Sequence, residues 1–105
     1  MREAIVGLPD DVQVVTHGIA NPAVIAYARS KIVDLVRYAG EPVLHVRVKL
    51  AHAPDPAVHA AFRAQATLDL NGRPIRAEAA AATPTEAIDL LQDRLRRRMI
   101  RAARA

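Results

Sequence analysis

The 105-residue sequence contains no cysteine and no tryptophan, and its aromatic residues are Tyr27, Tyr38 and Phe62. Without cysteine, the chain cannot form a disulfide scaffold, a cysteine-ligated zinc site or a thiol nucleophile. With so few aromatic residues, the core must be built from small aliphatic side chains, and the chain holds 22 alanines. A hydrophobic content of 51% with 25% charged residues is typical of one globular domain.

Signals for membrane insertion and for catalysis are also missing. No apolar run approaches the roughly 18 residues of a membrane span, and Glu3, Pro9 and Asp10 interrupt any signal peptide. The four glycines are isolated, which excludes a glycine-rich phosphate loop, and the single serine, Ser30, lies within a predicted helix. We therefore expect a cytoplasmic protein that is not an enzyme and that binds no cofactor.

The net charge of +4 is concentrated at one end of the chain. Residues 1–90 carry nine Lys/Arg and ten Asp/Glu, a net of −1, whereas residues 91–105 carry six Arg and one Asp, a net of +5. A concentrated basic segment on an otherwise balanced domain indicates a polyanionic partner, most often a nucleic acid.

Hydrophobic periodicity and capping signals predict six elements along the chain. Residues 1–10 have no period and form a flexible lead-in, and two prolines make residues 51–60 a loop. The helix starts are marked by Asn21-Pro22 and by the capping box that begins at Thr83-Pro84. The predicted strands are 11–16, 43–50, 61–70 and 73–81, and the predicted helices are 22–38 and 84–104.

The strand over 43–50 alternates between apolar and polar residues, so one face should be buried. On this pattern Leu44, Val46, Val48 and Leu50 point to the core, and Val43, His45, Arg47 and Lys49 point away from it.

Asn71-Gly72 is the strongest local signal, because this pair is preferred in two-residue type I′ hairpin turns. The turn would pair Leu68 with Ile75, so that apolar side chains meet across the hairpin. Pro74 cannot donate a backbone hydrogen bond, which indicates that strand 73–81 lies at a sheet edge.

The order of the elements predicts an α+β fold, namely a two-layer β-α-β-β-β-α sandwich. The first strand and the second, joined through a helix, should form a right-handed parallel crossover, and the last three strands an antiparallel meander. A four-stranded sheet with both helices on one face leaves its other face open. We expect residues 11–105 to form this single domain.

The arginines of helix 84–104 are the best candidates for a functional site. They recur with helical spacing and fall within about 120° of arc, beside the apolar stripe, over a length of about 15 Å. Asp93 is the only nearby acid, so most of them should lack a partner within the helix. The spacing of these arginines matches the successive phosphates of a nucleic-acid backbone. The alternative is that they form a solvated face and complement the dipole at the C-terminal end of the helix. The arginines are Arg94, Arg97, Arg98, Arg101 and Arg104.

Two further surfaces could add to this site. The open sheet face should carry His45, Arg47, Lys49, Arg63 and Arg76, although cross-strand salt bridges with Glu78 would account for the arginines equally well. Helix 22–38 should expose Tyr27, Lys31, Arg37 and Tyr38, and a tyrosine beside a lysine could stack on a base while the cation meets phosphate. The alternative is that these tyrosines cover the rim of the helix.

The histidines do not make a convincing metal site. His52 and His59 share the proline-rich loop with Asp55, but nothing supplies a third rigid ligand. We expect no metal.

Two regions carry motifs that gain specificity when they are taken together. One is the helix pattern Tyr27-Ala28, Lys31-Ile32, Leu35 and Arg37-Tyr38. The other comprises Leu68-Asp69-Leu70-Asn71-Gly72, Ile75-Arg76-Ala77, Glu86-Ala87-Ile88-Asp89-Leu90-Leu91 and Asp93-Arg94-Leu95. Over roughly residues 11–104, the chain resembles the ribosome hibernation promoting factors, also called ribosome-associated inhibitors or sigma-54 modulation proteins.

The resemblance implies the β-α-β-β-β-α fold that the residues also predict. It implies binding to the small ribosomal subunit in the channel used by mRNA and tRNA, with basic helix faces against ribosomal RNA. Such proteins silence idle ribosomes, and some promote ribosome dimers. Longer members carry a C-terminal dimerisation domain, so we also consider a homodimer that forms through a sheet edge or through such a domain.

The motif match places Lys31, Arg37, Arg94, Arg97 and Arg101 on basic positions of the family. Arg98 and Arg104 are additional, whereas Asp34 stands at a second position that is usually basic, and Thr85-Glu86 replace a common aromatic. The predicted RNA-binding residues are Lys31, Arg37, Arg47, Lys49, Arg76, Arg94, Arg97, Arg98, Arg101 and Arg104.

Two other functions compete with ribosome binding. A general double-stranded RNA-binding module has a similar element order, but its last helix opens with lysines, and here Glu86 and Asp89 stand there. The other is a non-catalytic interaction domain that dimerises through the sheet edges.

Overall fold

The computed structural model describes residues 12–19, 21–37, 39–53 and 61–103. The predicted lead-in over 1–10, Tyr38, most of the proline-rich loop and Arg104 lie outside the described residues. The elements are β1 (Val12–His17), α1 (Pro22–Arg37), β2 (Val43–His52), β3 (Phe62–Leu70), β4 (Arg73–Ala81) and α2 (Pro84–Ala103).

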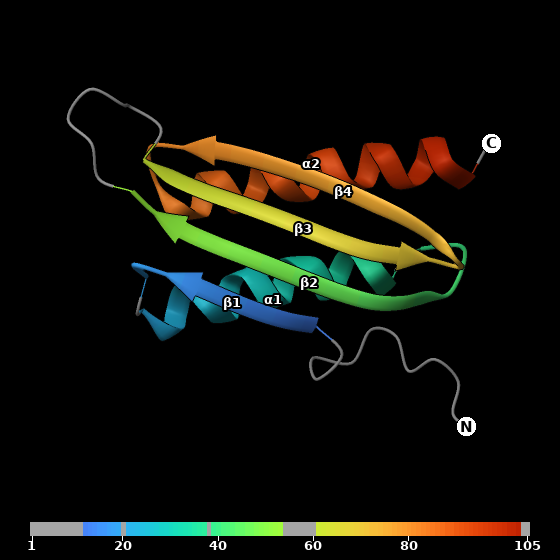
Figure 1. Ribbon diagram of the computed structural model, residues 1–105, viewed down its shortest axis with the longest axis horizontal. Helices are drawn as coiled ribbons and strands as arrows, with labels where there is room; N and C mark the ends of the chain where they lie inside the picture. The colour runs from blue at the N-terminus through green and yellow to red at the C-terminus, as the bar shows by residue number, and fades with distance from the viewer. Residues whose placement is uncertain (1–11, 20, 38, 54–60, 104–105) are drawn as a thin grey trace.

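The predicted α+β architecture is confirmed. The four strands lie in the order β1-β2-β3-β4, with β1 parallel to β2 and the other two pairs antiparallel. Both helices cover the same face of this sheet, as Figure 1 shows, and the other face is open. β4 lies at one edge of the described sheet, as the position of Pro74 predicted.

The Asn71-Gly72 turn sets the register of the β3–β4 hairpin. Both residues have positive φ angles, 53° for Asn71 and 94° for Gly72, as a type I′ turn requires. The carboxylate of Asp69 accepts a 2.6 Å hydrogen bond from the Gly72 amide, which holds the turn closed. Leu68 pairs with Ile75, so the predicted register is confirmed.

The start of β2 differs from the prediction. A β-bulge interrupts the pairing with β3 between Val43 and His45, and an extra residue in a strand reverses which side chains face the core. Val43 is therefore buried at 2% exposure, and Leu44 is 56% exposed. From Val46 onward the predicted alternation holds. The strand also runs two residues further than expected, to His52, whose ring stacks on Phe62 at 4.2 Å between centroids.

Each helix begins at the cap that the sequence indicates. The Asn21 side chain accepts a hydrogen bond from the Ala23 amide (2.9 Å), and the Thr83 hydroxyl accepts one from the Glu86 amide (3.2 Å). The Glu86 carboxylate in turn accepts the Thr83 hydroxyl proton, at 2.9 Å. These caps fix the helix starts and therefore the phase in which each apolar stripe meets the sheet.

The core lies between the helices and the covered face of the sheet, and its largest side chains are aliphatic. All five residues of the predicted α2 stripe pack there, four of them buried and Ala102 at the rim. Val33 of α1 is buried too, although the predicted stripe did not include it. The described residues include no buried polar or charged side chain, so this core is held by apolar burial alone.

We expect Leu95→Ala to lower the free energy of unfolding by about 2–5 kcal/mol, because Leu95 is fully buried and its loss leaves a cavity. The matched control is Ile100→Ala on the same helix, where the side chain is 48% exposed. It should cost about 1 kcal/mol or less. Urea denaturation measures both values, and equal losses would contradict this packing of α2.

Candidate nucleic-acid interface

The polar residues of α2 are divided between two flanks of its apolar stripe. At about 100° per residue, Arg94, Arg98 and Arg101 fall within about 60° of one another, on what we call the arginine flank. Asp89 and Asp93 lie away from this flank, on what we call the acidic flank, and of the two Asp89 contacts α1. The acids are therefore turned away from most of the basic charge of the helix.

The acidic flank is engaged by α1. The Tyr27 hydroxyl donates a hydrogen bond to the Asp89 carboxylate (2.5 Å), and the Lys31 ammonium lies 3.7 Å from the same oxygen. Lys31 also lies 5.3 Å from the centroid of the Tyr27 ring, and its carbonyl accepts a hydrogen bond from the Gln92 amide group (2.9 Å). These contacts tie α1 to α2. Tyr27 is half-buried and packs against the core, which favours the rim role over base stacking.

Asp93 engages the next turn of the helix. Its carboxylate pairs with Arg96 at 3.3 Å and with Arg97 at 2.9 Å. Arg97, one of the five arginines of the predicted site, therefore has a partner within the helix. An exposed pair of this kind contributes little to stability, so a stronger anion can displace it.

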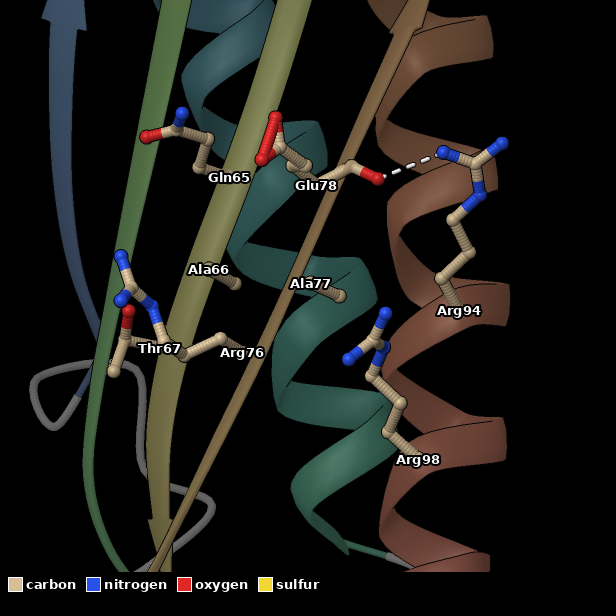
Figure 2. Close-up of a pocket in the computed structure, with 8 residues that line it drawn as sticks. All are labelled: Gln65, Ala66, Thr67, Arg76, Ala77, Glu78, Arg94 and Arg98. Carbon is tan, nitrogen blue, oxygen red and sulfur yellow. Dashed lines mark hydrogen bonds between the residues drawn. The ribbon is translucent and has the colours of Figure 1, made fainter.

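Arg94 links the arginine flank to the edge of the sheet. Its guanidinium donates a 2.8 Å hydrogen bond to the backbone carbonyl of Glu78, drawn as a dashed line in Figure 2. Counted from the turn, Gln65 and Glu78 form a non-hydrogen-bonded pair, so this carbonyl faces away from β3. Arg94 thus satisfies an edge group of β4 and is held in place by it.

Arg98 and Arg101 are exposed, and neither has an ion-pair partner within the described part of the chain. Arg37 is exposed at the last turn of α1. The structure therefore brings Arg94, Arg98 and Arg101 together on one flank and leaves Lys31 and Arg37 on the other helix.

The open sheet face carries the predicted basic side chains in rows that cross the strands. One row runs through Gln13, Arg47, Thr67 and Arg76, each the register partner of the next. Lys49 lies in the neighbouring row, which ends at Glu78. The side chains of His45, Arg47, Lys49, Arg63 and Arg76 are all exposed.

The alternative explanation for this face, cross-strand salt bridges, does not hold for the residues described. Neither Arg63 nor Arg76 forms an ion pair with Glu78 there, and their register partners are the uncharged Ala80 and Thr67. The arginines of this face thus remain available to an external anion.

Sequence reasoning missed the role of Arg73. Its guanidinium pairs with the Glu41 carboxylate and donates a hydrogen bond to the carbonyl of Ala102 near the end of α2. One side chain thereby ties the hairpin to the segment after α1 and to the end of α2. The only sequence signal for these contacts is that Arg73, directly after the turn, is opposite in charge to Glu41. Periodicity cannot connect the two residues, because they are far apart in the sequence.

Metal binding and membrane insertion find no support in the part of the chain that is described. Its residues contain no group of three or more His, Asp or Glu side chains that could hold a metal. His59 and Asp55 of the predicted loop lie outside it. Neither α1 nor α2 is long and apolar enough to cross a membrane.

The pKa of Tyr27 should exceed its ordinary value of 10.0, because the Asp89 carboxylate accepts the hydroxyl proton and because burial disfavours the phenolate. Ultraviolet titration of a Tyr38→Phe variant, in which Tyr27 alone reports, should give a raised midpoint, and adding Asp89→Asn should lower it. The raised pKa implies a stabilising contribution that is complete below about pH 10 and is lost as pH rises through the folded-state pKa. A midpoint that Asp89→Asn leaves unchanged would contradict the contact.

Comparison with solved structures supports the fold. The N-terminal domain of Thermus thermophilus Protein Y superposes with a TM-score of 0.70 at 26% identity, covering 88% of this chain and 98% of that one. A ribosomal subunit interface protein from Coxiella burnetii gives a TM-score of 0.72 at 18% identity, covering 90% and 98%. A search of curated protein sequences gave no match.

The family model described as "Sigma 54 modulation protein / S30EA ribosomal protein" matches residues 12–105, which include every helix and strand described above. The chain therefore belongs to the sigma-54 modulation protein / S30EA ribosomal protein family.

Proposed function

We propose that the protein binds the small ribosomal subunit in the channel used by mRNA and tRNA, and that it thereby silences translation and stabilises idle ribosomes. The observation that carries this proposal is the arginine flank of α2, whose arginines pair with neither Asp89 nor Asp93 in the described structure, in a chain of the S30EA ribosomal protein family. The proposed role is non-catalytic, since occupancy of the channel is enough to exclude mRNA and tRNA.

The arginine flank suits the phosphate backbone of ribosomal RNA. From Arg94 to Arg101 the helix rises about 10 Å, which lets one helix face meet several phosphates. Guanidinium groups form paired hydrogen bonds with phosphate oxygens and remain charged at any physiological pH. Contacts of this kind position a protein on RNA without reading its sequence.

The remaining predicted residues extend this surface. Lys31 and Arg97 already have carboxylate partners at 3.7 Å and 2.9 Å, so a phosphate must compete with Asp89 or Asp93 to reach them. Arg37, Arg47 and Lys49 are exposed and can meet RNA directly. We assign them supporting roles, and Arg104 is proposed from its place in the sequence alone.

A double-stranded RNA-binding module fits the charge distribution less well. The last helix of such a module would meet RNA through its first turns, yet the first turns of α2 carry the acidic residues Glu86 and Asp89. The positive charge lies in the second half of the helix. Ribosome binding therefore accounts for the observed distribution better.

We expect the protein to co-sediment with small ribosomal subunits and to repress cell-free translation. Replacing Arg97 and Arg101 together with Ala should weaken binding and reduce the slope of log K against log salt by about 1 per lost phosphate contact. Both positions are exposed, so the free energy of unfolding should change by only about 0.5 kcal/mol per site.

The control is Arg96→Ala, which removes one positive charge from the same helix at a position outside the predicted RNA-binding residues. It should bind like the parent. Absence of the parent protein from the ribosomal fraction at low salt would refute the proposed function. An unchanged salt slope in the double variant would instead mean that Arg97 and Arg101 contribute only to a solvated face.

A further inference from the structure

The surface around β4 contains a cleft of about 630 Å³ that joins predicted RNA-binding residues of α2 to one on the open sheet face. It lies where the edge strand meets α2, and side chains from β3, β4 and α2 line it (Figure 2). We call it the β4 cleft. The lining residues that matter here are Gln65, Thr67, Arg76, Glu78, Arg94 and Arg98.

The β4 cleft concentrates positive charge from two sides of one strand. Arg94 and Arg98 extend from successive turns of α2 toward β4, whereas Arg76 lies on the open face beside its register partner Thr67 (Figure 2). Glu78 is the single acid among the lining residues, so three arginines leave a net charge of +2. Within the described chain, no carboxylate pairs with any of these arginines.

The chemistry of the lining suits an anionic backbone better than a nucleotide base. Guanidinium groups on both sides of β4 can hydrogen-bond to the oxygens of successive phosphates, and Thr67 and Gln65 add neutral hydrogen-bond donors (Figure 2). No lining residue is aromatic, and the apolar wall is limited to Ala66 and Ala77. The cleft therefore lacks the platform on which a nucleotide base would stack.

The same row of the sheet continues the positive surface beyond the cleft. Arg47 lies in register with Thr67, two strands away from Arg76, a separation of about 10 Å at the usual strand spacing. An RNA strand that leaves α2 at Arg98 and crosses β4 would meet Arg76 first and Arg47 next.

We propose that the β4 cleft holds phosphodiester groups of an RNA strand that passes from α2 across the edge of the sheet onto its open face. This inference rests on the proposed function and adds a path to it, because the edge of β4 connects the arginines of α2 with the basic residues of the open sheet face. Arg94 positions the path, since its bond to the Glu78 carbonyl fixes its guanidinium at the edge. The Glu78 carboxylate limits affinity by repelling phosphate.

The test compares Arg76→Ala/Arg98→Ala with the parent and with Arg96→Ala, which lies outside the cleft. Each full-length variant is titrated with small ribosomal subunits and with poly(U) at several salt concentrations, and circular dichroism confirms equal folding. The double variant should bind poly(U) more weakly, on the order of tenfold per lost contact, and its salt slope should fall by about 1.4, which is about 0.7 per lost contact on a single strand. Glu78→Gln should bind a few times more tightly than the parent, and Arg96→Ala should stay within about twofold.

The outcomes separate this inference from the proposed function. If the parent binds subunits and the double variant matches Arg96→Ala on both ligands, the cleft is not on the RNA path, although ribosome binding stands. If the parent fails to bind subunits, the proposed function is wrong, and the poly(U) titration alone decides whether the cleft holds a phosphate backbone. Pyrophosphate serves as a third probe. The inference would be overturned if the parent binds pyrophosphate tightly and the double variant does not, while both bind poly(U) equally. The cleft would then take a free phosphate anion.

Discussion

The register of the β3–β4 hairpin is the constraint on which the rest of the molecule depends. The positive φ angles of Asn71 and Gly72 close a two-residue turn, and the period of two along each strand then assigns every side chain to a face. Ile75 and Ala77 are thereby buried under α2, whereas Arg76 and Glu78 emerge on the open face. A slip of one residue would bury two charges and destroy both the core and the β4 cleft.

The second organising feature is the separation of charge around α2. Its apolar stripe is fixed against the sheet by fully buried residues such as Leu91 and Leu95, so the helix cannot rotate to mix its flanks. The Asp89 carboxylate contacts Tyr27 and Lys31 of α1. The Asp93 carboxylate pairs with Arg97. The arginine flank consequently faces solvent and the β4 edge without carboxylate partners in the described structure, and its field is available to a polyanion.

Much of the fold could be predicted from the sequence because its signals are local. The Asn71-Gly72 turn, the Asn21 and Thr83 caps and the alternation of β3 each depend on residues within a few positions of one another. The bulge before His45 could not be predicted, because Val43 and Leu44 are both apolar and only the pairing with β3 decides which one is buried. In β2, the alternation of the sequence therefore predicted the wrong face only for Val43 and Leu44.

The candidate site was predicted less completely than the fold, for a related reason. Helical spacing was sufficient to group Arg94, Arg97, Arg98, Arg101 and Arg104 within one arc of the helix. It could not show that Arg97 pairs with Asp93, that Arg94 reaches the Glu78 carbonyl, or that Arg73 ties the hairpin to the end of α2. These contacts depend on side-chain direction and on elements distant in the chain, and periodicity carries no information about either.

The most direct test of the account is the orientation of the protein on the small ribosomal subunit, determined by electron cryo-microscopy of the complex. The account predicts that the arginine flank of α2 and the edge of β4 lie against ribosomal RNA, with phosphates near Arg98 and Arg76. The carboxylates of Asp89 and Asp93 should contact no RNA phosphate. A complex in which the acidic flank lies against RNA while the arginine flank faces solvent would contradict it.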